Sequence, residues 1–323
     1  MDLDAALTCT TSRPAQSRFA AALCTDANYL PYALFVARQL SEMHDLPDLD
    51  IVICVTGDCD IPASLNDLDL RICRISSGDT FKGLYLDARR TDAVYHRLAL
   101  PHVFQDEYDR ILYLDCDVFI QGGAFAPLFA IDMAGHAIAA VRDILQWSRP
   151  KAHVRAFQDF GLAPAKYFNS GVMLIDTAAY RASQLLERCI DFGRKNAARM
   201  RQHDQQLLNC VLHGDWLEIS PMWNWQRPLN LAYAQVSYPV AIMHFIGKRK
   251  PWNDPDHRVP PRFKPQVNAF LREHFPDHAS IPIRTAAEVP HFEKVKLAWN
   301  SFRRHGEMAR YIARFPDDLL EAK

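Results

Sequence analysis

The sequence predicts an α/β fold in which a mixed, mostly parallel β-sheet is flanked by helices and followed by a C-terminal helical tail. Three observations lead to this prediction. Short apolar runs alternate with helical patterns between residues 19 and 246, polar residues directly follow several of these runs, and the alternation fades beyond residue 253. Alternating strands and helices favour a sheet covered on both faces. Such sheets bind ligands at the carboxyl ends of their strands.

Each expected strand is a short apolar run bounded by polar or turn-forming residues. One helix is expected to begin near Asn28, a candidate N-cap, with Pro31 in its first turn. Pro101 predicts a kink or an end in the next helix. The expected strands cover residues 19–25, 50–56, 70–75, the start of 110–120, 137–141, 172–175 and 240–246, and the other helices cover 91–104, 177–200 and 203–212.

We expect three segments along the chain. Residues 1–17 are polar and irregular, which predicts a loose N-terminal extension. Residues 18–252 carry the alternating pattern and form the expected α/β domain. Residues 253–323 begin with five prolines between positions 255 and 276, so this tail is expected to wrap over the surface.

Composition excludes some classes of function. The formal net charge is -1, so no overall field attracts nucleic acid, and we expect no nucleic-acid partner. No apolar run approaches the ~20 residues that a membrane span needs. Asp2 and Asp4 argue against a secretory signal. The eight cysteines form no C-x-x-C pair and several lie in apolar runs, which predicts buried, reduced thiols and a cytoplasmic location.

The sharpest motif is a pair of aspartates at the end of an apolar strand. Asp115 and Asp117 follow the run Leu112–Leu114 and are two residues apart, so in extended backbone they face the same side. Magnesium and manganese prefer oxygen ligands and usually keep open positions for phosphates. The pair predicts a hard-cation site; the alternative is a polar turn that caps a buried strand.

A second cluster, HFIGKRKPW, follows a late apolar run at residues 244–252. His244 can supply a neutral imidazole to a manganese-like ion. Gly247 allows close approach of the backbone to a phosphate, and Lys250 offers a mobile positive charge. The alternative for His244 is a core histidine with satisfied hydrogen bonds.

Two further clusters place polar side chains beside apolar runs. Asn169 and Ser170 lie in FNSGV, as expected where a ligand meets a sheet, although a bulge or turn gives the same pattern. Asp204 and Gln205 open a helix. The Gln205 amide can bond sugar hydroxyls, whereas Asp204 can alternatively cap the helix.

With these four clusters in this order, the sequence resembles glycosyltransferase family 8, which includes glycogenin and bacterial lipopolysaccharide galactosyl- and glucosyltransferases. The resemblance spans about residues 19–252 and is carried by LYLDCDV, FNSGVMLID, DQQLLN and HFIGKRKPW. It implies a Rossmann-like GT-A fold, a manganese or magnesium ion, and a UDP-galactose or UDP-glucose donor. It also implies a retaining transfer of the hexose to a saccharide or glycolipid acceptor, as in lipopolysaccharide biosynthesis.

The resemblance also implies roles for individual residues. The metal ligands are expected to be Asp115, Asp117 and His244. The catalytic group is expected to include Gln205, Asp204 and Asp143 around the donor sugar. The donor nucleotide-sugar is expected to contact Thr25, Asp26, Asn28, Tyr29, Arg97, Asp115, Cys116, Asn169, Ser170, Gly247 and Lys250.

Two departures from the family pattern affect these expectations. Ala99 stands where similar bacterial members can carry a lysine, and residues 144–167, expected to border the acceptor, do not match well.

For the mechanism, the cation and Lys250 are expected to neutralise the departing diphosphate. Gln205 is a poor nucleophile compared with the carboxylates of retaining glycosidases. We therefore favour attack by the acceptor hydroxyl on the face that UDP leaves, with the UDP phosphate taking the proton.

Two other classes of protein fit parts of the sequence. A haloacid-dehalogenase-like phosphatase also has an apolar strand that ends in D-x-D, with the first aspartate as nucleophile. That motif normally follows the first strand, whereas at least three expected strands precede Asp115. A non-catalytic binder of sugar nucleotides or glycans would share the same residues as an enzyme.

The C-terminal tail contains an apolar stripe at helical spacing. A basic helix with aromatic residues can lie on an anionic membrane surface, so residues 290–315 predict a peripheral membrane contact, on the inner face if the protein is cytoplasmic. The alternative is a helix packed on the main domain. The stripe consists of Phe292, Val295, Trp299 and Phe302, with Lys294, Lys296, Arg303, Arg304, Arg310 and Arg314 around it.

Overall fold

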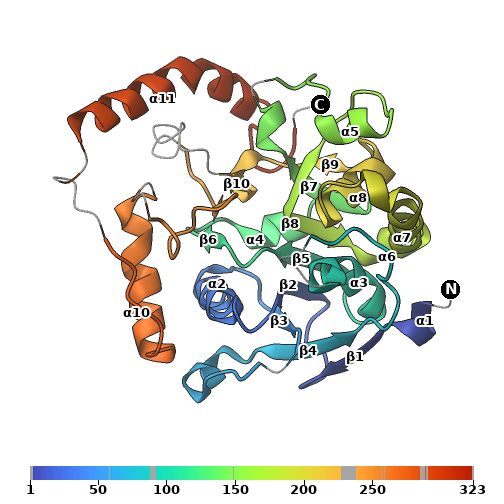
Figure 1. Cartoon of the computed structure of the whole chain (residues 1–323). Helices are drawn as coiled ribbons and strands as arrows, with labels where there is room; N and C mark the ends of the chain where they lie inside the picture. The colour runs from blue at the N-terminus through green and yellow to red at the C-terminus, as the bar shows by residue number, and fades with distance from the viewer. Residues whose placement is uncertain are drawn as a thin grey trace.

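The computed structural model describes residues 3–57, 59–87, 92–147, 149–226, 238–255, 257, 259–283, 288 and 290–321. Within these ranges a central sheet of eight strands runs through the molecule (Figure 1). Its strands, in spatial order, are β1 (Thr8–Thr11), β4 (Arg71–Ser76), β3 (Asp50–Val55), β2 (Phe19–Thr25), β5 (Arg110–Leu114), β8 (Phe168–Asp176), β7 (Ile138–Arg142) and β9 (Leu217–Glu218).

The sheet is mixed, as expected. Strands β4, β3, β2 and β5 are mutually parallel, and β9 is parallel to β7. Strand β8 lies antiparallel between β5 and β7. Because β8 runs in the opposite direction, its first residues lie beside the carboxyl ends of β5 and β7. This reversal places residues from distant parts of the sequence at one edge of the sheet.

A second, smaller sheet continues the chain beyond that edge. It contains β10 (Trp225–Gln226), β11 (Ile242–His244) and β6 (Val118–Ile120). Strand β11 is antiparallel to β6 and pairs His244 with Val118. The expected strand at 110–120 is therefore two strands in two sheets, which are separated by the Asp115–Asp117 turn. The Gln39 side chain bonds the backbone of Ile120 from both its amide atoms at 3.1 Å, which ties β6 to the main domain.

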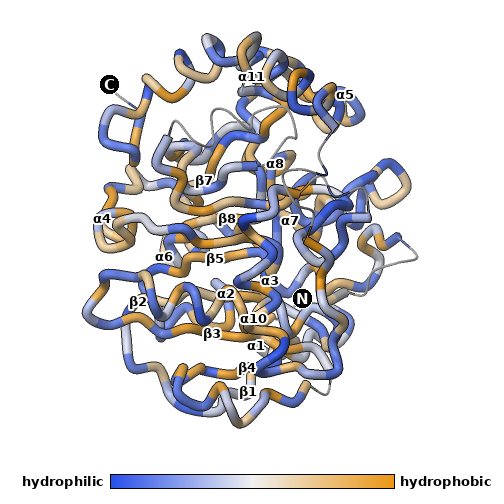
Figure 2. The backbone as a smooth tube through the Cα atoms, turned by 90° about the vertical axis from the view of Figure 1, so that its left-hand side faces the viewer, coloured by the Kyte–Doolittle hydropathy of each residue, from blue (hydrophilic) through white to orange (hydrophobic). Residues whose placement is uncertain are grey.

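Helices cover both faces of the central sheet (Figure 1). On one face lie α2 (Leu30–Met43) and α10 (Lys264–His274), and on the other lie α3 (His96–Val103), α6 (Thr177–Ala182), α7 (Leu185–Asn196) and α8 (Asp204–Leu212). The hydropathy tube shows apolar strands between more polar outer segments (Figure 2), and one large apolar cluster packs on each face of the sheet. The remaining elements are α1 (Leu3–Ala6), α4 (Phe125–Phe129), α5 (Arg155–Asp159), α11 (His291–Ile312), η1 (Ala63–Leu68), η2 (Asp92–Tyr95), η3 (Ile144–Gln146), η4 (Ala197–Arg199), η5 (Pro221–Trp223) and η6 (Pro261–Phe263).

The N-terminal part of the chain differs from expectation. The segment expected to be a loose extension contains β1, which pairs antiparallel with β4 at the edge of the sheet. Backbone pairing to an existing edge needs little apolar side-chain pattern, so the polar sequence gave no signal. Asn28, the expected N-cap, does not cap α2. Tyr29 is the N-cap residue, and the Asp26 carboxylate accepts a bond from its backbone N–H at 3.0 Å.

One cysteine pair also differs from expectation. Cys54 and Cys73 are register partners in the parallel strands β3 and β4, with Cα atoms 4.7 Å apart, and they form a disulfide. The prediction of uniformly reduced cysteines was therefore wrong for this pair. The two residues are 19 positions apart, and strand register alone brings them together. Within the described residues the other six cysteines are free thiols.

The C-terminal tail is more regular than expected and packs by one end only. The last turns of α11 and the residues after it are buried through Met308, Tyr311 and Phe315. The Tyr311 hydroxyl donates to Glu218, whose carboxylate also pairs with Arg142 inside the domain. In contrast, the first part of α11 arches away from the sheet (Figure 1). No helix of the described residues has the length and apolar content required to cross a membrane.

Candidate functional site

The polar clusters meet at one edge of the central sheet. Asp115 follows the carboxyl end of β5, Thr25 ends β2, and Asp143 follows β7. Asn169 lies at the start of the reversed strand β8. The backbone N–H of Asp115 donates to the Gly171 carbonyl at 2.8 Å, so the acidic turn is fixed directly against β8.

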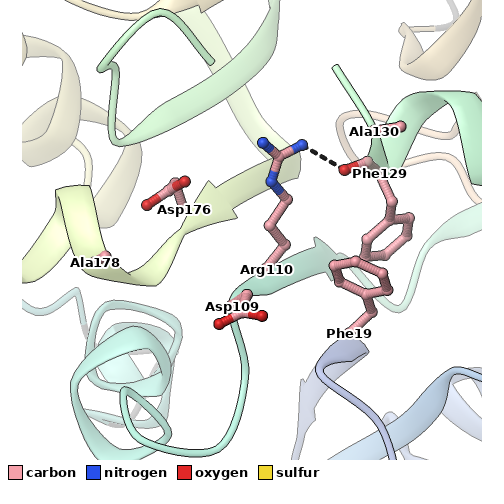
Figure 3. Close-up of a pocket in the computed structure, with 7 residues that line it drawn as sticks. All are labelled: Phe19, Asp109, Arg110, Phe129, Ala130, Asp176 and Ala178. Atoms are coloured by element: carbon pink, nitrogen blue, oxygen red, sulfur yellow. Dashed lines mark hydrogen bonds between the residues drawn. The ribbon is translucent and has the colours of Figure 1, made fainter. Parts of the chain in front are cut away.

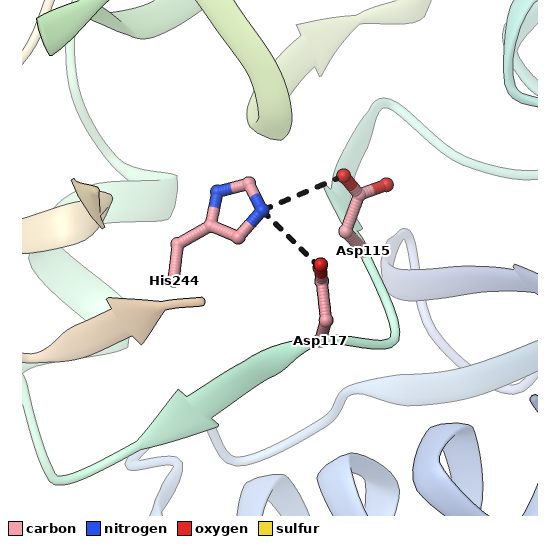
Figure 4. Close-up of side chains that lie close together, drawn as sticks. All are labelled: Asp115, Asp117 and His244. Atoms are coloured by element: carbon pink, nitrogen blue, oxygen red, sulfur yellow. Dashed lines mark ion pairs between the residues drawn. The ribbon is translucent and has the colours of Figure 1, made fainter. Parts of the chain in front are cut away.

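Two aspartates and a histidine converge at this edge, as predicted (Figure 4). The Nε2 atom of His244 lies 3.2 Å from Asp117 Oδ1 and 3.7 Å from Asp115 Oδ2. One ligand atom from each residue lies within 4.8 Å of the others. Two hard oxygens and an imidazole nitrogen are a suitable ligand set for manganese or magnesium, so the residues fit the expected ion.

Close packing beneath His244 explains the small residue in the NSG motif. A Cβ atom added to Gly171 would overlap the His244 ring and would lie 2.7 Å from Asp115 Oδ2. The imidazole and the carboxylate therefore occupy the space that any larger residue would need. Sequence analysis quoted this glycine within a motif but did not assign it to the site.

Lys250 contacts one of these two carboxylates, that of Asp117. Its ammonium group pairs with Asp117 and also donates to the Phe245 carbonyl. Burial alone would raise the pKa of Asp117, but the neighbouring His244 imidazole and Lys250 ammonium hold that pKa well below its ordinary value. Lys250 thus neutralises Asp117 in the same region where the ligand atoms converge.

Arg97 connects the acidic turn to the start of α8. Its Nη1 atom lies 2.9 Å from Asp115 Oδ1 and 3.2 Å from Asp204 Oδ2. Burial would lower the pKa of Arg97, but Asp115 and Asp204 raise it well above its ordinary value, so the guanidinium stays charged. Ser170 Oγ donates to Asp204 at 2.8 Å, which makes Asp204 part of this network as well as of the first turn of α8.

Tyr113 is a residue that sequence analysis missed. Its ring lies under the Arg97 guanidinium, 4.6 Å from ring centre to Cζ, and its hydroxyl donates to Asp115 Oδ1 at 2.9 Å. Tyr113 therefore contacts both the Arg97 guanidinium and the Asp115 carboxylate. In the run LYL it resembles any core residue of a strand, so only the hydroxyl group offered a signal.

The residues expected around the donor sugar include a hydrogen-bonded group. Asn169 Nδ2 donates to Gln205 Oε1 at 3.1 Å, and Gln205 Nε2 donates to Asp143 Oδ2 at 3.3 Å. Burial raises the pKa of Asp143, and the bonds from Leu145 N and Gln205 only partly offset this effect. Two of the three residues expected around the donor sugar, Gln205 and Asp143, are thus joined to Asn169 in one network, whereas Asp204 bonds Ser170.

A cavity of about 610 Å³ opens over this edge of the sheet. Two cysteines at its floor are protonated, because burial raises the pKa of Cys24 to about 12 and that of Cys116 well above its ordinary value. Neither thiol is therefore suited to act as a nucleophile at neutral pH. The cavity is lined by Cys24, Thr25, Asp26, Asn28, Tyr29, Ala93, Val94, Arg97, Asp115, Cys116, Asp117, Gly247 and Lys250, which include all expected donor-binding residues except Asn169 and Ser170.

A second cavity, of about 480 Å³, lies at the opposite ends of β2 and β5 (Figure 3). Its only arginine, Arg110, donates to the carbonyl groups of Phe129 and Ile131 and so is already engaged. The residues that line it include two carboxylates but no cluster of metal ligands. Among the described residues, the candidate metal ligands and most of the expected donor-binding residues lie at the first cavity.

With this geometry in place, comparison with known proteins identifies the class of protein. The sequence model of glycosyl transferase family 8 matches residues 20–256, which include the acidic pair, the NSG segment, the start of α8 and the loop after His244. The chain belongs to this family. The phosphatase alternative is overturned by this match, and four strands of the described chain precede β5, the strand that leads into Asp115.

Individual relatives agree with the family assignment. The chain is 34% identical over 178 residues to general stress protein A of Bacillus subtilis, covering 50% of this chain and 60% of that protein. It is 29% identical over 187 residues to the lipopolysaccharide glucosyltransferase WaaO of Escherichia coli, covering 55% and 54%. The matched region thus spans little more than half of each relative's length.

A solved structure supports the fold. The galactosyltransferase LgtC, determined in complex with donor and acceptor sugar analogues, superimposes with a TM-score of 0.64 at 22% identity. The match covers 86% of this chain and 99% of that chain. The mixed sheet with its flanking helices is therefore the GT-A fold that the sequence predicted.

Proposed function

We propose that the protein transfers a hexose, galactose or glucose, from a UDP-sugar to a saccharide or glycolipid acceptor with retention of anomeric configuration. The observation that carries this proposal is the convergence of Asp115, Asp117 and His244 beside the cavity. Membership of family 8 supports glycosyl transfer as the reaction class. The sugar names come from relatives, because WaaO is a glucosyltransferase and LgtC a galactosyltransferase.

A manganese or magnesium ion would be held by the two aspartates and His244. When bound, such an ion supplies Lewis-acid neutralisation of a diphosphate leaving group. Arg97 is partly buried between Asp115 and Asp204, so its role is to orient these carboxylates. Lys250 adds a positive group at the cavity wall and would bind diphosphate oxygens once it leaves Asp117.

The orientation of Gln205 bears on the mechanism. Its carbonyl oxygen accepts from Asn169 Nδ2 at 3.1 Å and from the Ser170 N–H at 3.3 Å. An amide oxygen engaged by two donors is a weak nucleophile. This arrangement supports attack by the acceptor hydroxyl on the face from which UDP departs, with a phosphate oxygen taking the proton. Gln205 and Asp143 would then hold sugar hydroxyls.

The acceptor side is expected near the loop that follows Asp143. Leu145 in η3 is 67% exposed, and the adjacent Trp147 is buried against Tyr311 of α11 with the rings 5.8 Å apart. The loop therefore connects the sugar-side carboxylate to the C-terminal helix. WaaO acts in lipopolysaccharide synthesis by its name, and a glycolipid acceptor would place the cavity close to a membrane.

We propose that the first part of α11 makes a peripheral contact with an anionic membrane. Its apolar stripe is open to solvent, with Phe292, Trp299 and Phe302 between 62% and 75% exposed. Lys294 and Lys296 beside the stripe are exposed and positively charged. Aromatic side chains combined with basic ones suit the headgroup region of a membrane. The inner face of the cytoplasmic membrane is the proposed location.

The test is the release of UDP from a panel of UDP-sugars, with manganese and with a chelator. Slow hydrolysis releases UDP even without the acceptor, so we expect metal-dependent UDP release from UDP-galactose or UDP-glucose. Asp117→Ala should abolish release, because it removes a ligand, whereas Gln205→Ala should leave residual activity. Full activity of Asp117→Ala in the presence of the chelator would refute the scheme. Tight UDP-sugar binding with no turnover under any condition would instead favour a non-catalytic binder.

A further inference from the structure

A continuous row of hydrogen-bonded side chains crosses the site from His244 to Asp143. His244 Nδ1 lies 2.9 Å from Asn224 Oδ1, and Asn224 Nδ2 lies 2.9 Å from Asn169 Oδ1. The row continues through the bonds from Asn169 to Gln205 and from Gln205 to Asp143. Asn224 is fully buried, and sequence analysis did not identify it.

Two backbone N–H groups fix the direction of every bond in this row. A backbone N–H can only donate, so its partner must be an acceptor. Gly171 N donates to Asn169 Oδ1 at 3.1 Å, and Ser170 N donates to Gln205 Oε1 at 3.3 Å. The two carbonyl oxygens are thereby assigned, and the amide nitrogens of Asn169 and Gln205 must donate onward.

The same logic determines Asn224 and His244. Because Asn169 Oδ1 is an acceptor, the atom of Asn224 that faces it is the amide nitrogen. The carbonyl oxygen of Asn224 then faces His244 Nδ1 and requires a hydrogen on that nitrogen. With a hydrogen held on Nδ1, Nε2 is the ring nitrogen left to offer a lone pair when a cation binds. Nε2 faces Asp117 and Asp115 (Figure 4).

We propose that Asn224 is a positioning residue that holds His244 in the Nδ1–H tautomer and thereby presents Nε2 as a ligand for a divalent cation. Three electron-rich atoms within 4.8 Å of one another repel, and a cation between them removes this repulsion. Partners of this kind on metal-binding histidines are known to fix ring orientation. The same backbone donors, Gly171 N and Ser170 N, therefore fix both the orientation of the Gln205 amide and the hydrogen on His244 Nδ1.

The segment around Asn224 also bonds the backbone beside Asp143, at the other end of the row. Two residues later, Gln226 in β10 donates from Nε2 to the Arg142 carbonyl at 2.9 Å and accepts from Ile144 N at 2.8 Å. Arg142 and Ile144 flank Asp143 in the sequence. Residues 224–226 therefore contact the metal ligand with one side chain and the loop of the sugar-side carboxylate with another.

The test measures manganese affinity in the absence of any nucleotide, by electron paramagnetic resonance of free Mn²⁺. Asn224→Leu has a similar size and cannot accept from Nδ1, so we expect affinity to fall by about 10- to 100-fold. Asn224→Asp still accepts from Nδ1, but its second oxygen faces Asn169 Oδ1 and cannot donate to it, so this variant should recover only part of that loss. Equal affinity of folded Asn224→Leu and the unaltered protein would overturn the proposal.

Gln146→Leu is the matched control. Gln146 is also a fully buried amide, and its side chain bonds the backbone of Ala152, Ala165 and Tyr167 rather than a metal ligand. This variant should lose thermal stability while the folded protein keeps its manganese affinity. A loss of affinity equal to that of Asn224→Leu would assign the effect to general loosening and would overturn the positioning role.

A second measurement does not involve the metal. In the metal-free protein with ¹⁵N-labelled histidine, the ring nitrogen shifts of His244 should show a hydrogen on Nδ1, and in Asn224→Leu that nitrogen should be partly without it. The signal is assigned by its loss in His244→Gln. A neutral ring in the unaltered protein with its hydrogen on Nε2 alone would contradict the proposal. The role of Asn224 in metal binding rests on the proposed function, whereas the tautomer of His244 does not. A protein that shows the Nδ1–H signal but no UDP-sugar turnover would therefore reject only the proposed function.

Discussion

At the scale of single residues, Gly171 shows how tightly the site is built. A methyl group at this position would overlap the His244 ring and approach Asp115 Oδ2 to 2.7 Å. The backbone of Gly171 is not in the left-handed region, so alanine is prevented by contacts rather than by backbone conformation. We predict that Gly171→Ala displaces a metal ligand and lowers manganese affinity at least tenfold, as measured by titration without nucleotide.

Gly193→Ala is the control for this prediction. A methyl group there would come within 2.5–3.0 Å of the side chains of Leu84 and Leu207, which belong to the core on the helical face. It should lower the unfolding temperature by overpacking while the manganese affinity stays unchanged. If both alanine variants lost stability equally and neither lost manganese, Gly171 would be a packing residue only.

Residues of the site divide into those that the sequence can predict and those that it cannot. Asp115 and Asp117 were predictable, because two carboxylates at the end of an apolar strand have few structural reasons to be there. Tyr113 was not, because it lies in an apolar strand where a core tyrosine gives the same pattern, and Asn224 was not, because its partners are far away in sequence. Asn224 meets Asn169 at a separation of 55 residues, and no local pattern encodes that contact.

At the scale of elements, two contacts hold the turn that carries Lys250 after β11. Backbone bonds of 3.0 and 3.1 Å join Lys250 and Asn253, and Trp252 stacks on Tyr32 of α2 with ring centres 3.8 Å apart. Gly247, at φ +81°, allows the chain to enter this turn in a left-handed conformation. The turn is thereby held against α2 while its lysine reaches Asp117.

The pairing of Lys250 with Asp117 leads to a prediction about metal binding. A lysine that neutralises a ligand carboxylate competes with the ion until diphosphate attracts the ammonium group away. We predict that Lys250→Met binds manganese alone about three- to tenfold more tightly, which corresponds to about 0.7–1.4 kcal/mol. The same variant should bind UDP more weakly at saturating manganese. Calorimetric titrations with Mn²⁺ and then UDP measure both effects.

Lys248→Met provides the comparison within the same turn, because Lys248 is exposed. It removes an equal charge without touching Asp117 and should change manganese affinity little. Weaker manganese binding by Lys250→Met would mean that the lysine supports the ion rather than competing with it.

The elements themselves were predictable where their signal was local. The runs at 19–25 and 50–56 became β2 and β3 almost residue for residue, since a buried strand needs a continuous apolar run. The reversed direction of β8 was not predictable, because apolar periodicity carries no information on strand direction. The strands β6 and β10 are three and two residues long, too short for a pattern of their own, whereas β11, which brings His244 to Asp117, lies inside the expected strand at 240–246.

At the scale of the whole molecule, α11 combines an anchored end with an open one. Tyr311 bonds Glu218 inside the domain, and Arg314 pairs with the same carboxylate at 3.4 Å. Trp147, in the loop after Asp143, stacks on Tyr311. Core packing, one of the two expected alternatives, therefore holds for the last part of the helix, and membrane contact stays a proposal for its first part. This division depends on tertiary contacts, so the amphipathic pattern alone could not locate it.

The open part of α11 leads to the last prediction. We expect a triple variant, Phe292→Ser with Trp299→Ser and Phe302→Ser, to lose binding to vesicles that contain anionic phospholipid. These side chains are 62–75% exposed, so their removal should leave the unfolding temperature nearly unchanged while it removes apolar contact with the lipid. Binding of the unaltered protein should weaken with added salt, because Lys294 and Lys296 contribute electrostatic attraction. Vesicle co-sedimentation measures both effects.

The control variant removes exposed apolar side chains elsewhere. Leu86 and Ile283 are 41% and 47% exposed and lie outside α11, so Leu86→Ser with Ile283→Ser should bind vesicles like the unaltered protein. Vesicle binding that survives the triple variant would show that α11 is not the contact surface. Because the anchored end of α11 packs on the loop after Asp143, a membrane contact through its open end would place that loop, and the acceptor side of the cavity, toward the lipid surface.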